Sequence, residues 1–237
     1  MMRSTLTGLA LLSLGSFLVA CGDPPSLYGD SNAANSSMTK KTAMPDMAQL
    51  APYPPPPYGN QAGDVLANLK VTGYRMSPTQ TDSTQLMWDD TITLEDFHAN
   101  PKLKCMLISF SATWCNPCNQ EQGVLPGDVA NDPSFGVLNI LIEGPVDGSQ
   151  MVTKDDVDNW TQKFSQNYPV VTGGDSSGKS RQDLESLWIG WGPGGSNSIG
   201  LPFNMVVRTT DMQVADVIQG FGPTIHDDAV AKCEALP

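Results

Sequence analysis

The sequence predicts a folded α/β domain in which strands alternate with helices. Buried strands are indicated by apolar runs at 106–110, 137–142, 203–207 and, less clearly, 214–218. Segments with helical composition lie before, between and after these runs, at 94–100, 115–129, 154–167, 181–188 and 224–236. Such alternation favours the α/β class. Hydrophobic residues make up 40% of the 237 residues, so the chain can bury a substantial core.

The chain begins with a segment typical of an export signal. A basic start at Arg3 is followed by an apolar run over 6–20, which is shorter than the roughly 20 residues of a spanning helix. The residues Leu, Val and Ala then precede Cys21, a pattern that resembles the lipobox of bacterial lipoproteins. The alternative is an ordinary secretory signal with an incidental cysteine. We expect residues 1–20 to be removed and Cys21 to be lipidated, which gives an extracytoplasmic, membrane-anchored lipoprotein on the periplasmic side.

Residues 21–64 have the composition of a Pro/Ser-rich disordered tether. The stretch 22–63 holds eight prolines and few branched aliphatic residues, so it cannot bury enough apolar surface to offset its chain entropy. The folded domain is expected over 65–237. The whole chain has 25 acidic against 13 basic residues and a net charge of −12, which excludes a nucleic acid as a predicted partner.

The chemistry is expected where the strand over 106–110 meets the helix over 115–129. Cys115 and Cys118 lie three residues apart on the first turn of that helix, close enough to form a small-ring disulfide. Pro117 suits this turn, in which backbone N–H groups have no partner within the helix. The positive end of the helix and its free N–H groups stabilise a thiolate. We therefore expect Cys115 to be the nucleophile and Cys118 the resolving thiol.

Two other readings of the cysteine pair are a zinc site and a purely structural disulfide. Zinc would need a second pair of ligands, but the histidines, His98 and His226, are isolated from each other in the sequence. A short Cys-x-x-Cys loop stabilises a fold little and is easily reduced. We expect no metal and no cofactor other than the redox-active Cys115–Cys118 disulfide.

The segment 110–118, with the sequence Phe-Ser-Ala-Thr-Trp-Cys-Asn-Pro-Cys, resembles the signature of the thioredoxin superfamily. The resemblance is greatest to its extracytoplasmic redoxin branch, the TlpA/ResA-like thiol-disulfide oxidoreductases, and it covers residues 65–237. It implies a thioredoxin-like fold, with a central mixed β-sheet flanked by helices. It also implies that Trp114, Asn116 and Pro117 contact the substrate.

The resemblance assigns roles to three further residues. Glu121 matches an acid that ResA-like proteins place near the cysteines; the alternative is an exposed helical glutamate. Pro202 stands where the fold carries a cis-proline, with Leu201 offering its backbone to the substrate; the alternative is a proline that ends a loop. Ser109 departs from the pattern, because thioredoxin has a buried aspartate there. Glu121 would then take over the proton of Cys118, through water.

The resemblance also suggests a pairing for the two remaining cysteines. In this fold the strand that leads to the active site begins at the far end of the sheet, and the terminal helix runs back toward that end. Cys105 begins that strand and Cys233 lies near the end of that helix. We expect a structural Cys105–Cys233 disulfide, with two separate buried thiols as the alternative.

The activity implied is exchange or reduction of disulfides in protein thiol clients, with a membrane-anchored electron donor that restores the dithiol. The alternatives are a Cu(I)-binding metallochaperone and a thiol peroxidase. Copper chaperones of this fold use Cys-x-x-x-Cys and a distant histidine, and the peroxidase pattern would need proline and threonine where Ile108 and Ala112 stand. An apolar rim for a protein substrate is a further possibility, formed by Trp114, Trp188 and Trp191, against the alternative of core tryptophans beneath a surface loop.

Overall fold

The computed structural model describes residues 52–76, 86–98, 100–144, 151–173, 183–190 and 199–237. All of these residues belong to one compact unit, 47–237. The predicted signal peptide, Cys21, most of the tether and Trp191 therefore lie outside the described residues. No helix within these ranges has the length and apolar content that crossing a membrane requires.

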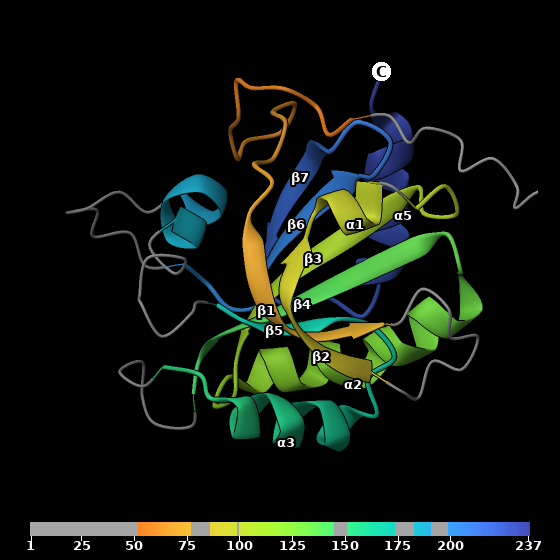
Figure 1. The fold of residues 1–237 in the computed structure, drawn as a ribbon. Helices are drawn as coiled ribbons and strands as arrows, with labels where there is room; N and C mark the ends of the chain where they lie inside the picture. The colour runs from red at the N-terminus through yellow and green to blue at the C-terminus, as the bar shows by residue number, and fades with distance from the viewer. Residues whose placement is uncertain (1–51, 77–85, 99, 145–150, 174–182, 191–198) are drawn as a thin grey trace, which may run out of the picture. The chain divides into compact units, whose positions relative to one another are not determined.

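A mixed seven-stranded β-sheet forms the centre of the unit (Figure 1), in the order β2-β1-β5-β4-β3-β6-β7. The central strands β3, β4 and β5 run parallel, and the strands on either side join antiparallel. The strands are β1 (Lys70–Met76), β2 (Leu86–Thr93), β3 (Cys105–Ala112), β4 (Phe135–Glu143), β5 (Val170–Thr172), β6 (Phe203–Arg208) and β7 (Gln213–Gln219). The predicted α/β class, with a central mixed sheet flanked by helices, is confirmed.

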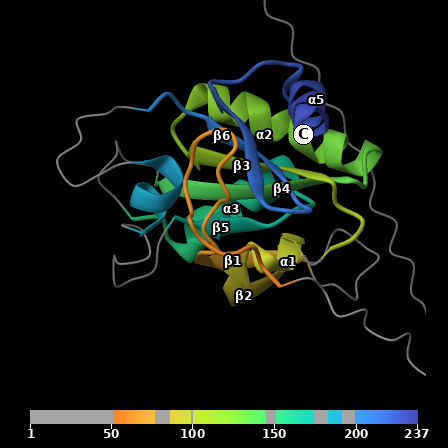
Figure 2. The same cartoon turned by 90° about the horizontal axis from the view of Figure 1, so that it is seen from above.

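Helices cover both faces of this sheet (Figure 2). One core cluster joins the sheet to α2 (Asn116–Asn131), α3 (Lys154–Phe164) and α5 (Ile225–Ala235). The other cluster joins the opposite face to α1 (Glu95–His98), the π-helical turn η1 (Glu185–Ile189) and the chain around Leu66. β3 and β4 lie between the two clusters, which explains why every residue of β3 and all but the last residue of β4 are buried.

The folded chain begins before residue 65, which corrects the predicted boundary of the tether. The Tyr53 hydroxyl donates to the carbonyl of Leu66 at 2.7 Å, and the Tyr53 ring packs edge-on against His98. The backbone N–H of Gly63 donates to the carbonyl of Val214 at 2.8 Å. Composition alone suggested a disordered segment, but these contacts attach residues 52–64 to the sheet and its first helix.

A disulfide joins Cys105, at the start of β3, to Cys233 in α5, across a sequence separation of 128 residues. Both cysteines are buried in the core cluster that α5 shares with the sheet. The bond ties the terminal helix to the amino-terminal end of the central strand, which is the end opposite Cys115.

Candidate active site

Three segments meet at the carboxyl end of β3. The strand ends at Ala112, and α2 begins four residues later. In the sheet, Phe110 of β3 pairs with Phe203 of the antiparallel β6, so the preceding residue Pro202 lies beside this end. The Leu201–Pro202 peptide bond is cis. The parallel strand β4 ends at Glu143, opposite Ala112, and supplies the third segment.

Cys115 and Cys118 form a disulfide at the start of α2. Cys115 is the residue that caps the helix, in an extended conformation, and its sulfur accepts a hydrogen bond from the backbone N–H of Cys118 at 3.1 Å. The neighbours Asn116 and Pro117 are exposed, whereas Cys115 is only 3% exposed and Cys118 is fully buried. The sulfur of Cys115 therefore lies where helix N–H groups stabilise a negative charge.

Asn119 and Lys163 support the backbone of this turn. The Asn119 amide donates to the carbonyls of Cys115, at 2.6 Å, and of Thr113, at 3.4 Å. The ammonium group of Lys163, from α3, donates to Asn119 Oδ1 at 2.5 Å. Through Asn119, a positive charge is thus linked to the peptide group of Cys115.

A groove of about 390 Å³ opens beside the disulfide. Trp114 is 51% exposed, and its indole Nε1 donates to Glu143 Oε2 at 3.0 Å. The lining residues come from all three segments: Trp114, Cys115, Asn116, Pro117, Ile142, Glu143, Ile199 and Leu201. Every residue predicted to contact the substrate is therefore in this groove.

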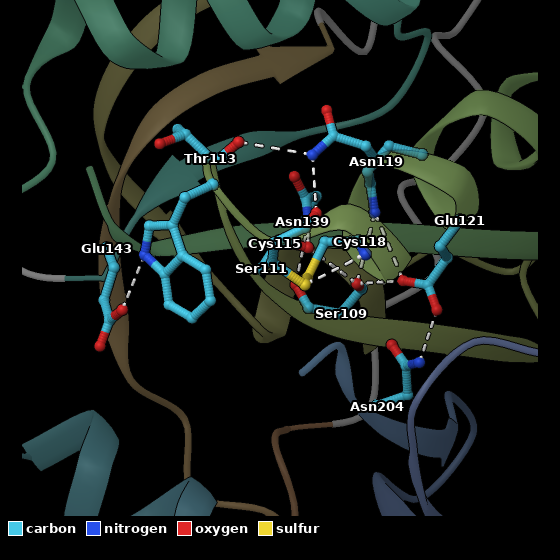
Figure 3. The surroundings of a disulfide bond; sticks show 12 residues. Ser109, Ser111, Thr113, Cys115, Cys118, Asn119, Glu121, Asn139, Glu143 and Asn204 are labelled. Atoms are coloured by element: carbon cyan, nitrogen blue, oxygen red, sulfur yellow. Dashed lines mark hydrogen bonds between the residues drawn. A yellow bond between two sulfur atoms is a disulfide. The ribbon is translucent and has the colours of Figure 1, made fainter. Parts of the chain in front are cut away.

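Glu121 lies on the other side of the cysteine pair from Glu143 (Figure 3) and is fully buried. The alternative of an exposed helical glutamate is therefore wrong. Its carboxylate accepts hydrogen bonds from Ser109 at 2.5 Å, Asn204 at 2.7 Å and Gln122 at 3.4 Å. Burial raises the pKa of Glu121 to about 7, and these three donors lower it only in part.

Glu121 rests on a polar row that crosses three neighbouring strands. Ser109 of β3 pairs with Asn139 of β4 on one side and with Asn204 of β6 on the other. Asn139 donates to the Ser109 carbonyl at 3.0 Å and to the Ser111 hydroxyl at 2.9 Å, and it accepts from the indole of Trp160 at 2.9 Å. The buried acid thus has neutral polar partners and no cation among the described residues.

The sequence interpretation missed Asn139 and Asn204 as parts of the site. Their signal was present, because each is a single polar residue inside an otherwise apolar run, 137–142 or 203–207. A further arm of the network was also missed: the side-chain oxygen of Gln122 accepts from Gln166 at 2.6 Å and from Tyr168 at 2.8 Å.

Three residues that the sequence singled out, Cys105, Cys233 and Trp188, lie away from the groove. Cys105 and Cys233 are at the opposite end of β3. Trp188 lies in the core, where its indole donates to the carbonyl of Ala67 at 2.8 Å, so it forms no part of an apolar rim. Within the described ranges, no group of three or more His, Cys, Asp or Glu side chains is arranged to hold a metal ion.

No family model and no curated protein matches the chain. Among solved structures, the chain is similar to a Chlorobium tepidum protein assigned as the thiol:disulfide interchange protein DsbE, with 17% identity, a TM-score of 0.49 and coverage of 75% of this chain and 98% of that one. A thiol:disulfide interchange protein from Bacteroides sp. has 13% identity and a TM-score of 0.48, with coverage of 74% and 92%. The pneumococcal exposed lipoprotein thioredoxin of Streptococcus pneumoniae has 20% identity and a TM-score of 0.43, with coverage of 72% and 100%.

Proposed function

We propose that this protein is a membrane-tethered, extracytoplasmic thiol-disulfide oxidoreductase that reduces or exchanges disulfides in protein clients. The observation that carries the proposal is the Cys115–Cys118 disulfide, which caps α2 beside an open groove. Two cysteines in this position can change between dithiol and disulfide without rearranging the sheet. Cys115 faces the groove, so a client sulfur can reach it.

In the reductive direction, the Cys115 thiolate attacks one sulfur of a client disulfide. A mixed disulfide forms between Cys115 and the client, and the other client sulfur leaves as a thiolate. Cys118 then loses its proton and attacks the Cys115 sulfur, which restores the Cys115–Cys118 bond and releases the second client thiol. The client gains two electrons, and the two cysteines lose them.

Glu121 is suited to take the proton of Cys118. It follows Cys118 by three residues on α2, so the two side chains lie on the same face of the helix. Both are fully buried, and the pKa of Glu121, raised to about 7 by burial, lets it exchange a proton near neutral pH. This assigns to Glu121 the task that the serine at position 109 cannot perform.

The location and partners belong to the same proposal. The export signal and Cys21 argue for a lipid anchor outside the cytoplasm, and the buried Cys105–Cys233 disulfide is chemically consistent with an oxidising compartment. A membrane-anchored dithiol donor would return two electrons to the Cys115–Cys118 disulfide after each turnover. Pro202 and Leu201 would hold an extended client segment along the groove.

The test is a single-turnover assay in which the reduced protein reacts with a peptide disulfide. We expect Cys115→Ser to abolish the reaction and Cys118→Ser to stop it at a mixed disulfide that intact mass measurement detects. The paired variant Cys105→Ser/Cys233→Ser controls for the loss of cysteines as such and should react like the wild type. Turnover by Cys115→Ser at the wild-type rate would overturn the proposal.

A further inference from the structure

The groove beside Cys115 is mostly apolar, with Asn116 at the cysteine turn and one acid at the end of β4. Ile142, Ile199 and Leu201 give it an apolar wall, and Glu143 is the charged residue among those that line it. We propose that this groove selects client segments with a lysine or arginine next to the reacting cysteine, and that Glu143 is the specificity-determining residue. The inference rests on the proposed function and adds the chemistry of its client.

An irregularity in the sheet places Glu143 at this site. Ser111 pairs with Leu141, but the next residue of β3, Ala112, pairs with Glu143, so Ile142 is an extra residue in β4. Such a bulge re-aims the side chains that follow it. The backbone carbonyl of Glu143 also accepts from the N–H of Thr113 at 3.2 Å, which fixes the end of β4 to the loop that carries Cys115.

The Glu143 carboxylate is already oriented before a client binds. Oε2 accepts from the exposed indole of Trp114 at 3.0 Å. The other oxygen, Oε1, has no hydrogen-bond or ion-pair partner among the residues that the structure describes. A fixed carboxylate with one oxygen available, in an apolar groove, attracts a cationic side chain more strongly than an acid in open solvent does.

The apolar residues of the groove suit the aliphatic stem of that cationic side chain. Ile142 and Ile199 offer apolar surface for the stem of a lysine or arginine, while the charged head meets Glu143. The net charge of −12 also draws cationic clients toward the protein over a longer range. If pairing with Glu143 causes the preference for a cationic client, removing an acid elsewhere leaves that preference unchanged. If the net charge causes it, removing any acid weakens it. A matched control variant therefore separates the two effects.

The experiment compares three peptides, each with a single cysteine blocked as the same small-molecule mixed disulfide. They differ only in the residue next to the cysteine, which is lysine, glutamine or glutamate. The second-order rate constant with the reduced full-length protein is measured for each. For the wild type we expect the lysine peptide to react about three- to tenfold faster than the glutamate peptide, the range of a partly exposed ion pair.

Two variants test the assignment. Glu143→Gln keeps an oxygen that can accept from Trp114 but removes the charge, and it should bring the lysine-to-glutamate rate ratio close to one. Glu234→Gln removes the same charge from α5 beside Cys233, at the far end of the domain, and should keep the wild-type ratio. Equal ratios in the wild type and Glu143→Gln, or an equal fall in both variants, would overturn the role of Glu143. A reduced protein that reacts with none of the peptides would instead overturn the proposed function.

Discussion

Glu121 is a buried acid whose protonation is coupled to folding. Burial raises its pKa to about 7 in the folded protein, against 4.5 for a glutamate in water. Between these values the folded state binds more protons than the unfolded state. The part of the stability that this proton contributes is therefore fully present below pH 4.5 and is lost as the pH rises through 7. The loss amounts to about 3–4 kcal/mol, at about 1.4 kcal/mol for each pH unit.

Glu121→Gln should remove this part of the pH dependence. The glutamine stays neutral, and its single oxygen can accept from Asn204 while its NH2 group donates to the Ser109 hydroxyl, so the variant should be more stable than the wild type at pH 8. Urea unfolding at pH 5 and pH 8 measures the difference. The pKa of His226 is also raised, because hydrogen bonds to Asp227 and Asp132 outweigh the lowering by burial, but His226 is present in both proteins and its contribution cancels. An unchanged slope between pH 5 and 8 would contradict the assignment to Glu121.

Lys163 is expected to increase the reactivity of Cys115 without touching it. Its positive charge reaches the Cys115 peptide group through Asn119, and a nearby cation stabilises a thiolate. Lys163→Gln should slow alkylation of the reduced Cys115 near neutral pH by about two- to threefold, a modest effect because Lys163 is exposed.

The control for Lys163 is another lysine of the same helix. Lys154 lies over two aromatic rings, those of Tyr74 and Trp88, and it pairs with Asp158. Among the described residues, Lys154 contacts none of the cysteine turn. Lys154→Gln should therefore leave the alkylation rate unchanged, and an equal slowing in both variants would mean that only the net charge matters.

At the scale of residues, the sequence predicted the atoms that react but not those that surround them. Cys115, Cys118 and Glu121 follow one another at intervals of three residues at the start of α2, so their spacing in the sequence alone brings them together. Asn204 and Asn139 come from other strands, and only the pairing of β3 with β6 and β4 places them beside Ser109. Strand register is a long-range property that a local pattern does not contain.

At the scale of elements, strands were predicted where they are buried on both faces. β3, β4 and β6 are mostly apolar and almost entirely buried, because other parts of the chain cover both faces of the sheet there. β5 has three residues, too few for a pattern, and β1 mixes charged residues with Gly73. These strands owe their conformation to their neighbours in the sheet, and the sequence interpretation did not list them among its strands.

Gly73 permits the contact between β1 and β5. A Cβ at this position would overlap the carbonyl oxygen of Val170 and the Cα of Val171, both of which belong to the backbone. Gly73→Ala should therefore destabilise the domain by about 1–3 kcal/mol, the usual cost of overpacking. The matched control is Gly123→Ala in α2, where a Cβ meets nothing within 4 Å, and which should stabilise the helix by about 0.5–1 kcal/mol. A loss of stability in both variants, measured by urea unfolding, would contradict this account of β1.

At the scale of the whole molecule, stability and chemistry are assigned to opposite ends of the central strand. The Cys105–Cys233 disulfide closes a loop of 128 residues that contains β3 to β7 and most of the helices. Its loss should cost about 2–4 kcal/mol, because the unfolded chain gains conformational freedom. β3 separates Cys105 from the groove by roughly 23 Å, at about 3.3 Å per residue, so the disulfide has no direct contact with the reacting sulfurs.

The paired variant Cys105→Ser/Cys233→Ser should therefore unfold at a lower urea concentration and exchange disulfides at the wild-type rate. The paired variant Cys115→Ser/Cys118→Ser should show the reverse, with near wild-type stability and no exchange, because a loop of three residues constrains the unfolded chain little. Measuring both properties in both variants separates the two bonds. Loss of exchange in Cys105→Ser/Cys233→Ser, under conditions where that variant remains folded, would show that the terminal helix positions the active site as well as stabilising the fold.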